Sequence, residues 1–594
     1  MRNIAMRNIT EQIKCERPCL VRVKLNNQEK TLDFGTKPDT MENSVSGIIV
    51  DESQGFVVTH GSLIAPFLSH HSRILSGLRK YNHFITCDEQ ISVDVLVQES
   101  EKVQSFDINS QPTSKRPKSY FTELLNCSVN KGCHGRSLQQ FRGRLISVFK
   151  CKKFEDALQH LMPVEAGWKF NENYQKQSDV NDTPTNQSHI ALNDEVAQSL
   201  VALLPCFVLI GLEMPVRCDD EPLCLPHFQQ CRIGDMSEVV ATPFGGLSPE
   251  VFMNSYSKGV ISNVSGGSGV LMLTDARCIP GSEGGALYVR DANGIRCLQG
   301  IIVSPLCWKN NEWIGLALAC SLREILYDMA DVLSSASRSL PIKPGLKTRI
   351  DSSQLGASPE SMSVVLVRSG STWGSGVLID HQLGLLLTCS HVVKWGTKPA
   401  VLVKFPVRRR WFTADILYCT PAGQQFDIAV LQTRDPVPEG TRVQPLSAQA
   451  IKEGLDVQVT GHALFDEDRC LTPSVTSGVI SKITKFSEIP VLIQTTCAVH
   501  AGASGGVVTD QVGHLLAIVV CNAKDISTGA CYPHVNLCVP INTIWPVIDS
   551  YRKSKDKEVL KALHISNQYV QKLWNLGMMD NSRGEKPTMI TSKL

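Results

Sequence analysis

Short apolar runs bounded by glycine or turn residues recur along the chain from about residue 363 onward. The runs are SVVLVRSG, GSGVLID, GLLLTCS, AVLVKF, DIAVLQ, DVQVTG, GVISKI, VLIQTT, GGVVTD and LLAIVV. Each is roughly four to eight residues long, and their spacing is about ten residues, which is typical of strands in an all-β barrel or sandwich. We therefore expect this half of the chain to be an all-β domain.

A glycine-rich segment within this pattern contains a candidate nucleophile, Ser504, in Gly502-Ala503-Ser504-Gly505-Gly506. A serine hydroxyl is a weak nucleophile unless an adjacent base takes its proton. The backbone N–H groups of Gly502 and Ser504 are the natural candidates for an oxyanion hole. Taken alone, the segment fits a glycine-rich turn after a strand equally well.

Two further residues could activate this serine. His391 follows the apolar run 384–390, where an imidazole can face a cleft, although a histidine in this position is often a buried core residue. Asp427 opens the apolar run DIAVL, so its carboxylate should be partly buried, which is unfavourable without a partner. A hydrogen bond to the imidazole would satisfy it and fix the tautomer. The alternative is an aspartate in a turn at the end of a strand.

The chain order His391, Asp427, Ser504 matches the chymotrypsin triad and neither the subtilisin nor the α/β-hydrolase order. Residues 364–551 resemble a trypsin-fold serine protease of the Deg/HtrA type in the stretches LLLTCSHVV, FDIAVLQ, LTPSVTSGVISKI, VLIQTTCAVHAGASGGVV and VNLCVPINTIWPVID. The resemblance implies His391 as general base, Asp427 as its orienting residue and Ser504 as nucleophile. The approach 501–503, Ala-Gly-Ala, departs from the Pro-Gly-Asn type usual in these proteases, so the oxyanion donors stay open.

The first half of the chain repeats the pattern of the second half. Residues 47–59, GIIVDESQGFVVT, repeat residues 376–388, GVLIDHQLGLLLT, at an offset of 329, and at this offset His391 falls on Ser62. The segment CIPGSEGG likewise repeats the nucleophile segment, with glutamate in place of the serine. We therefore expect a second, degenerate unit that performs no hydrolysis.

The comparison leaves two alternatives open in the degenerate unit. The glutamate that replaces the nucleophile is Glu283, and a local slip of the register would instead bring the neighbouring His60 and Ser282 into the catalytic positions. The best match to the aspartate strand is SLVALL, which begins at Ser199.

These comparisons predict an all-β chain of two tandem trypsin-like double β-barrel units, the first degenerate, followed by a short C-terminal helix. The expected segments are a degenerate unit over 1–330, with long insertions at about 98–135 and 165–190, a linker over 331–362, a catalytic domain over 363–552, and a C-terminal helix and tail over 553–594.

The tail ends in Ser592-Lys593-Leu594, the peroxisomal import tripeptide that a receptor reads. Gly584 and Pro587 discourage a helix before it, so we expect an exposed tail.

Composition excludes several other classes of protein. The chain has 594 residues with 59 basic and 57 acidic side chains, which gives no electrostatic reason to expect a nucleic-acid partner. No apolar run is long enough for a membrane span, and the first residues lack the apolar centre of a secretory signal. The 21 cysteines are scattered without CxxC pairs, so we expect reduced thiols and no metal site. Cys389 and Cys497 flank the motifs, but neither lies between glycines as a nucleophile would.

The degenerate first unit together with the C-terminal tripeptide resembles the peroxisomal (glyoxysomal) processing proteases. This resemblance implies limited endoproteolysis of imported matrix proteins, including removal of N-terminal targeting leaders, together with self-processing and homo-oligomerisation. The expected partners are matrix protein substrates and the peroxisomal import receptor, and no cofactor is required. Two alternatives stay open: a non-catalytic peroxisomal adaptor and a general degradative Deg-like protease.

Overall fold

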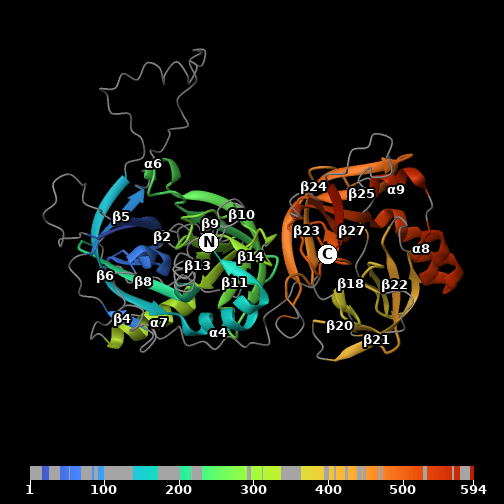
Figure 1. Cartoon of the computed structure of the whole chain (residues 1–594), viewed down its shortest axis with the longest axis horizontal. Helices are drawn as coiled ribbons and strands as arrows, with labels where there is room; N and C mark the ends of the chain where they lie inside the picture. Colours follow the sequence, from blue (N-terminus) through green and yellow to red (C-terminus); the bar gives the residue numbers. More distant parts are fainter. Residues whose placement is uncertain are drawn as a thin grey trace, which may run out of the picture.

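The computed structural model forms two lobes that lie side by side, one from each half of the chain (Figure 1). It describes residues 17–25, 41–52, 54–67, 83–85, 91–98, 138–170, 201–214, 216, 231–290, 294, 296–310, 312–335, 363–393, 400–406, 410–421, 426–437, 445, 450–465, 470, 472–525, 531–564, 567–574 and 589–593.

The first lobe contains two six-stranded antiparallel rings. The first ring consists of β1 (Arg17–Leu25), β2 (Met41–Asp51), β3 (Phe56–His60), β8 (Cys206–Leu212), β6 (Leu138–Lys150) and β5 (Ile91–Gln98). The pairing of β6 with β8 closes it, and β4 (His83–Ile85) is added outside β6. The second is a closed barrel of β10 (Ser255–Ser265), β11 (Leu271–Thr274), β16 (Ala317–Ser321), β13 (Arg296–Ser304), β12 (Ala286–Arg290) and β9 (Met236–Ala241).

The second lobe repeats this architecture. Its closed barrel consists of β17 (Val364–Ser369), β18 (Thr372–Asp380), β19 (Leu385–Thr388), β22 (Ala429–Thr433), β21 (Trp411–Cys419) and β20 (Val401–Lys404). Its second ring consists of β23 (Asp456–Gly461), β24 (Ser474–Phe486), β25 (Ile489–Thr495), β28 (Cys531–Pro540), β27 (Leu515–Asp525) and β26 (Val507–Thr509), with β29 (Met589–Lys593) added along β27. The predicted pair of double-barrel units is therefore confirmed.

Some strands are buried on both faces because one face fills a barrel and the other packs on neighbouring structure. All four residues of β19 are buried, as are all residues of β27 except its last two. Such continuous apolar runs, rather than alternating ones, are what the sequence shows in these segments.

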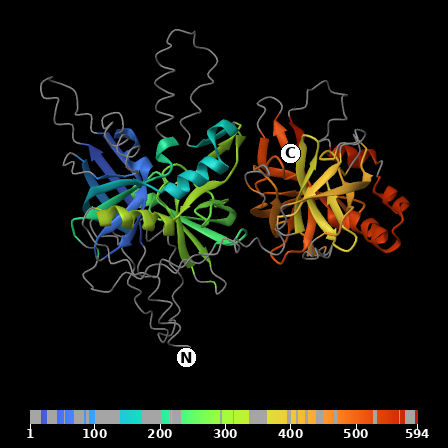
Figure 2. The same ribbon diagram turned by 90° about the horizontal axis from the view of Figure 1, so that it is seen from below.

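Helices cover the outside of the barrels. They are α4 (Lys152–Leu161), α6 (Pro249–Phe252), α7 (Leu322–Ser335), α8 (Ile541–Ser554) and α9 (Gln568–Trp574), with 3₁₀ turns η1 (Gly61–Phe67), η2 (Val164–Ala166) and η8 (Lys557–Leu563). Helix α8 lies at the end of the second lobe that is remote from the first lobe (Figure 2). The helix expected within 553–577 is instead divided among the end of α8, η8 and α9, because Lys555 adopts a left-handed φ of 57° that ends α8.

Two expected segment boundaries differ from the structure. Helix α7 continues to Ser335, past the start of the predicted linker at 331. Part of the second predicted insertion is buried rather than exposed, since Trp168 and Phe170 at the two ends of β7 (Trp168–Phe170) are 1% and 4% exposed. These aromatic side chains pack in the interior although the residues around them are mostly polar. Residues 99–135 and 171–190 of the two predicted insertions lie outside the described residues.

A continuous hydrophobic cluster joins the two lobes. It includes Phe149 and Trp168 of the first lobe together with Val457 and Ile480 of the second. The Trp168 ring stacks on Phe465 with 5.5 Å between ring centroids.

Polar groups also link the lobes. The Asp275 carboxylate accepts hydrogen bonds from the backbone N–H and the hydroxyl of Ser477. Asn263 donates to Ser474 Oγ at 3.1 Å, and both side chains are buried. These contacts lie at the boundary where β10 of the first lobe meets β24 of the second (Figure 1). The lobes therefore share an interior, which two loosely tethered domains would not do.

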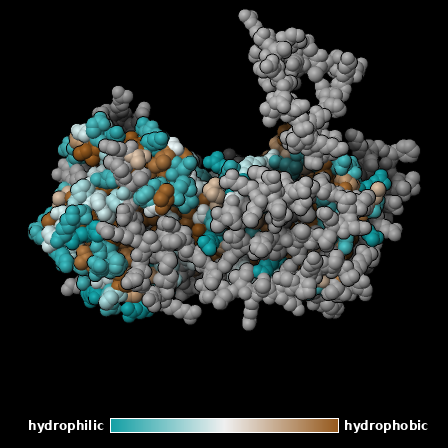
Figure 3. Space-filling view, turned by 180° about the vertical axis from the view of Figure 1, so that it is seen from behind, coloured by the Kyte–Doolittle hydropathy of each residue, from teal (hydrophilic) through white to brown (hydrophobic). Residues whose placement is uncertain are grey.

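Hydrophilic residues cover much of the described surface in Figure 3, with smaller hydrophobic patches between them. Within the described ranges, no helix is both long and apolar enough to cross a membrane.

Candidate functional site

The three candidate catalytic residues come from both barrels of the second lobe. His391 follows β19, and Asp427 precedes β22, which pairs with β19 by placing Thr388 opposite Ala429. This pairing brings the two segments together where the strands meet. Ser504 lies in the loop between β25 and β26 of the other ring.

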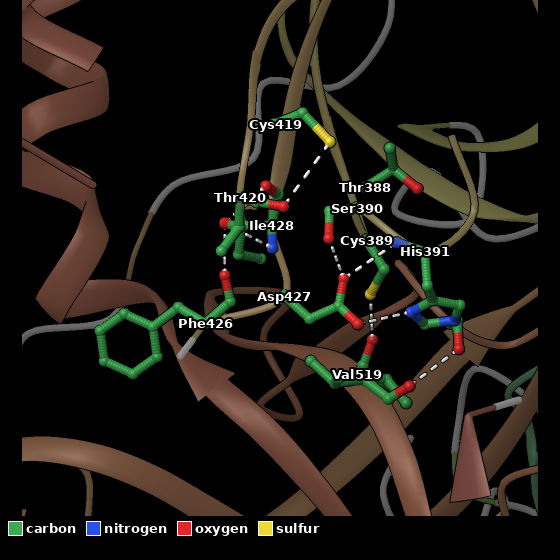
Figure 4. A network of polar contacts seen from close by, with 12 residues as sticks. Thr388, Cys389, Ser390, His391, Cys419, Thr420, Phe426, Asp427, Ile428 and Val519 are labelled. Atoms are coloured by element: carbon green, nitrogen blue, oxygen red, sulfur yellow. Dashed lines mark hydrogen bonds and ion pairs between the residues drawn. The ribbon is translucent and has the colours of Figure 1, made fainter. Parts of the chain in front are cut away.

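His391 and Asp427 form a direct pair. His391 Nδ1 lies 2.7 Å from Asp427 Oδ2, and Figure 4 shows the carboxylate pointing toward the imidazole ring. The other carboxylate oxygen accepts from the backbone N–H of His391 at 2.9 Å and from the hydroxyl of Ser390. Three donors therefore stabilise the ionised form of a carboxylate whose residue is only 8% exposed.

This pairing fixes the imidazole tautomer. Because Asp427 Oδ2 accepts a hydrogen bond, the Nδ1 of His391 carries the proton and Nε2 carries the lone pair. His391 Nε2 is buried and has no hydrogen-bond partner among the described residues. A buried, unpaired basic nitrogen is unfavourable for folding, but it is what a general base requires.

The Ser504 loop is held against β27. Gly505 donates its N–H to Val519 O at 2.8 Å, and the Ser504 hydroxyl donates to Val520 O at 2.8 Å. Cys389, two residues before His391, also donates to Val519 O (Figure 4). The same peptide oxygen of β27 thus contacts both the histidine segment and the serine loop.

A sharp turn precedes Ser504. Gly502 has a φ of 94°, a conformation that favours glycine, and a Cβ at this residue would lie 2.2 Å from the Trp373 ring. The Gly502 carbonyl accepts from Ser375 Oγ at 2.8 Å, and Ser375 Oγ accepts in turn from His462 N–H. Because the carbonyl is held this way, the peptide at Gly502 has one defined orientation.

Sequence reasoning missed the supporting residues Ser375, Thr388 and Ser390. Thr388 Oγ1 donates to the carbonyl oxygen of Ser375, and Ser390 donates to Asp427. The internal repeat carried a signal for two of them, since Ser46 and Thr59 stand at the offset of Ser375 and Thr388. Nothing in the sequence singled out Ser390.

The first lobe keeps this scaffold of hydrogen bonds. Thr59 Oγ1 donates to Ser46 O, and Ser46 Oγ donates to Gly281 O, which repeat the bonds of Thr388, Ser375 and Gly502. Gly281 and Gly284 have φ values of 88° and 81°, against 94° and 85° for the equivalent Gly502 and Gly505.

The first lobe lacks the candidate base and nucleophile at the corresponding positions of this scaffold. Glu283 stands where Ser504 stands in the second lobe, and its carboxylate accepts from Gly281 N–H at 2.7 Å. The loop that would hold an oxyanion therefore binds a carboxylate of its own chain. Ser62, in the position of His391, contacts His60 Nδ1 at 3.0 Å.

The two residues that a register slip would have recruited do not form a catalytic pair. Burial lowers the pKa of His60 to about 4, and its Nε2 lies 3.2 Å from Leu204 O. The hydroxyl of Ser282 accepts from Ile279 N–H. Both groups therefore contact backbone atoms rather than each other.

The predicted counterpart of the aspartate is wrong. Strand β3 pairs with β8 by placing Thr59 opposite Val208, as Thr388 lies opposite Ala429 in the second lobe. Counting back two residues from each, Asp427 corresponds to Cys206 rather than to the segment that begins at Ser199. Residues 201–203 of that segment are helical and Leu204 lies in a turn, so the apolar content of the segment did not indicate a strand.

The remaining candidates support no alternative chemistry. Burial raises the pKa of Cys497 to about 12, so this thiol is not a nucleophile at neutral pH. In the described part of the chain, no group of three or more His, Cys, Asp and Glu side chains could hold a metal ion.

Part of the tail that was predicted to be exposed forms a strand. Ser592 and Lys593 belong to β29, whose backbone pairs with β27, and Leu594 lies outside the described residues. The polar stretch before the tail favoured no strand. Because β27 is distant in the sequence, no local pattern predicted its pairing with β29.

Comparison with known proteins shows to which family the chain belongs. Residues 374–518, which include all three candidate residues, match the trypsin-like peptidase domain. The chain is 30% identical over 569 residues to a human protein named peroxisomal leader peptide-processing protease, covering 91% of this chain and 94% of the relative. The chain belongs to this family. The mouse protein of the same name is 29% identical over 568 residues, with the same coverage of both chains.

The chain is accordingly a serine protease of the peroxisome. One solved structure, an HtrA-type protease AlgW with tripeptide, is 20% identical and matches with a TM-score of 0.27, covering 34% of this chain and 62% of that chain. In this chain, the first-lobe positions that correspond to His391, Asp427 and Ser504 hold Ser62, Cys206 and Glu283.

Proposed function

We propose that the second lobe is an endopeptidase in which Ser504 is the nucleophile, His391 the general base and Asp427 the residue that orients the base. The observation that carries the proposal is the His391–Asp427 pair at 2.7 Å, together with a His391 Nε2 that has no hydrogen-bond partner in the described part of the chain. The second observation is the position of Ser504 beside β27, next to the oxygen that also contacts the histidine segment.

The reaction begins with a rotation of the Ser504 hydroxyl away from Val520 O and toward His391 Nε2. As Oγ attacks the scissile carbonyl carbon, its proton passes to Nε2 and the carbonyl π electrons move to the oxygen. Backbone N–H groups of Gly502 and Ser504 stabilise that oxyanion, each donor contributing about 3 kcal/mol in such sites. Protonated His391 then gives its proton to the leaving amine, and the C–N bond breaks.

The second half of the reaction regenerates the serine. Water gives a proton to His391 Nε2 as its oxygen attacks the acyl carbon, and the ester bond to Ser504 Oγ breaks. The proton returns to Oγ, and the carboxylic product leaves. Asp427 stays ionised throughout and stabilises the imidazolium form.

The substrates that we propose are proteins imported into the peroxisomal matrix, from which the enzyme removes N-terminal targeting leaders. The names of the curated relatives support this substrate class. We also propose that Ser592-Lys593-Leu594 is read by the import receptor and that the active protein is a homo-oligomer. We further propose that the protein cleaves itself within the insertion at 98–135, of which residues 99–135 lie outside the described residues.

Incubation of peroxisomal proteins with the enzyme, followed by N-terminal sequencing of the products, tests the proposal. We expect one or two defined cuts per substrate, and none with Ser504→Ala. Many small fragments would favour a general degradative protease. No cleavage by either protein would favour the adaptor. Cleavage by Ser504→Ala would overturn the assignment of the nucleophile.

A further inference from the structure

The edge of β27 is shared by three segments of the chain in succession. Strand β26 pairs with its first part, with Val507 opposite Ile518. The nucleophile loop follows, since Gly505 N–H donates to Val519 O and Ser504 Oγ donates to Val520 O. Strand β29 then pairs antiparallel with residues 521–525. The tail strand and the candidate nucleophile therefore lie end to end along one edge.

The register brings the tail to the nucleophile. Met589 lies opposite Asp525 and Lys593 lies opposite Cys521, so β29 runs along β27 toward Val520. Val520 is also the residue whose carbonyl accepts from Ser504 Oγ. Ser504 itself is 0% exposed in this arrangement.

The same stretch of edge is where an extended substrate would gain main-chain hydrogen bonds. Extended peptides commonly bind proteins by adding a strand to an open sheet edge. The opposite edge of β27 is paired with β28 from Ala517 to Lys524. On the edge of β27 that faces away from β28, the residues beyond the Ser504 loop pair with β29 in the described structure.

We propose that β29 is a pseudosubstrate strand, which binds the active-site edge of β27 in competition with extended peptide substrates. The proposal rests on the proposed role of Ser504. It implies that residues 589–593 serve two binding partners in turn, because a receptor that holds the tail must first remove it from β27. Release of the tail by the receptor or by a substrate strand opens the same edge.

Removal of the tail should have a defined kinetic signature. A tethered segment acts at an effective concentration of about millimolar, so a strand that binds with a Kd near 0.1 mM raises the apparent KM about tenfold. Because the inhibition is competitive, kcat at saturating substrate should not change. A general loss of structure would lower kcat instead.

The variants use the backbone requirement of strand pairing. Adjacent residues of an edge strand point their N–H groups in opposite directions, so Ile590→Pro with Thr591→Pro removes a donor toward β27 whichever residue supplies it. The matched control is Ile590→Ala with Thr591→Ala, and a chain ending at Pro587 is the second test. With a fluorogenic leader peptide, we expect the proline pair and the shortened chain to lower KM about tenfold at unchanged kcat. An unchanged KM in both would overturn the proposal.

Direct binding separates this proposal from the proposed function. A fluorescent peptide of residues 587–594 is titrated into the shortened chain that carries Ser504→Ala. Saturable binding that a leader peptide displaces supports the pseudosubstrate strand, whatever the activity of the enzyme. No binding at millimolar peptide would overturn it. Residual cleavage by Ser504→Ala would instead contradict the role of Ser504 and leave this binding result valid.

Discussion

The Asp427 carboxylate shows most clearly how single residues determine this site. It receives hydrogen bonds from Ser390 Oγ, from His391 N–H and from His391 Nδ1, which together hold the imidazole in one tautomer and one orientation. An amide at this position could donate to Nδ1 and so move the proton to Nε2.

We therefore expect Asp427→Asn to lower kcat by about 10⁴-fold with the fold intact. The measurement is kcat on a leader peptide, together with the thermal midpoint. Asp510→Asn is the matched control, since Asp510 Oδ2 also pairs with a histidine, His514, at 2.8 Å. A kcat that falls equally in both variants would contradict the specific role of Asp427.

Residue types and their chain order predicted the three candidate residues, but only the fold could supply their supports. The His391–Asp427 contact depends on β19 pairing with β22. No sequence pattern distinguishes Ser390, because its hydroxyl contacts Asp427 on a segment that only the pairing of β19 with β22 brings close.

At the scale of elements, the hairpin of β14 (Cys307–Lys309) and β15 (Glu312–Trp313) connects the first lobe to the nucleophile loop of the second. Ile314 O, just after β15, lies 2.7 Å from Nε2 of buried His500. Because a carbonyl can only accept, His500 donates, and its position two residues before Gly502 places this bond at the base of the loop.

We expect His500→Ala to lower kcat about tenfold, because a buried carbonyl left without a donor costs about 1–3 kcal/mol and the loop will shift to avoid it. His500→Gln, which keeps an N–H donor, should restore most of the activity. The measurement is kcat and KM on a leader peptide, with His514→Ala as the control. Equal kcat for His500→Ala and the unmodified chain would show that the hairpin does not position the loop.

Most strands of the second lobe were predictable because their apolar runs are continuous and bounded by glycine or turn residues. Strand β21 was not predicted, because its sequence WFTADILYC is only partly apolar and only partly buried. The match of Ser199 to the aspartate strand failed because an apolar helical turn and an apolar strand look alike over six residues. Strand β29 was missed because the partner that orders it, β27, precedes it by more than sixty residues.

At the scale of the whole molecule, three buried histidines make stability depend on pH. Burial lowers the pKa values of His60, His462 and His500 to about 4 in the folded state. The unfolded chain, with histidine pKa values near 6.5, therefore binds more protons than the folded chain between about pH 6.5 and pH 4. The stabilising contribution is fully present above this range and is lost as the pH falls through it.

Each such histidine contributes a slope of up to about 1.4 kcal/mol per pH unit to the unfolding free energy in that range. We expect denaturant unfolding between pH 6.5 and pH 4.5 to show the combined slope of the three histidines, up to about 4 kcal/mol per pH unit. His60→Gln, remote from the nucleophile, should reduce it by the equivalent of one proton. An unchanged slope would show that His60 is not held neutral in the fold.

The hydrophobic cluster that spans both lobes makes each lobe depend on the other. Separating residues 363–594 from the rest would expose Val475, which is 2% exposed in the whole chain and clusters with Ile233 and Val260 of the first lobe. It would also expose the ring of Phe465 that stacks on Trp168. Burial of one large apolar side chain contributes about 1.5–3 kcal/mol, and several would be lost together. The degenerate lobe therefore contributes part of the interior of the catalytic lobe.

We expect residues 363–594 expressed alone to aggregate or to unfold at a lower temperature than the whole chain. Co-expression with residues 1–335 should restore a soluble complex with the activity of the whole chain. Size-exclusion chromatography and thermal unfolding measure both outcomes, and a whole chain cut within 336–362 is the control for loss of covalent connection. If residues 363–594 alone were monomeric, fully active and equally stable, the shared interior would contribute nothing to catalysis, and the first lobe would be retained for another partner.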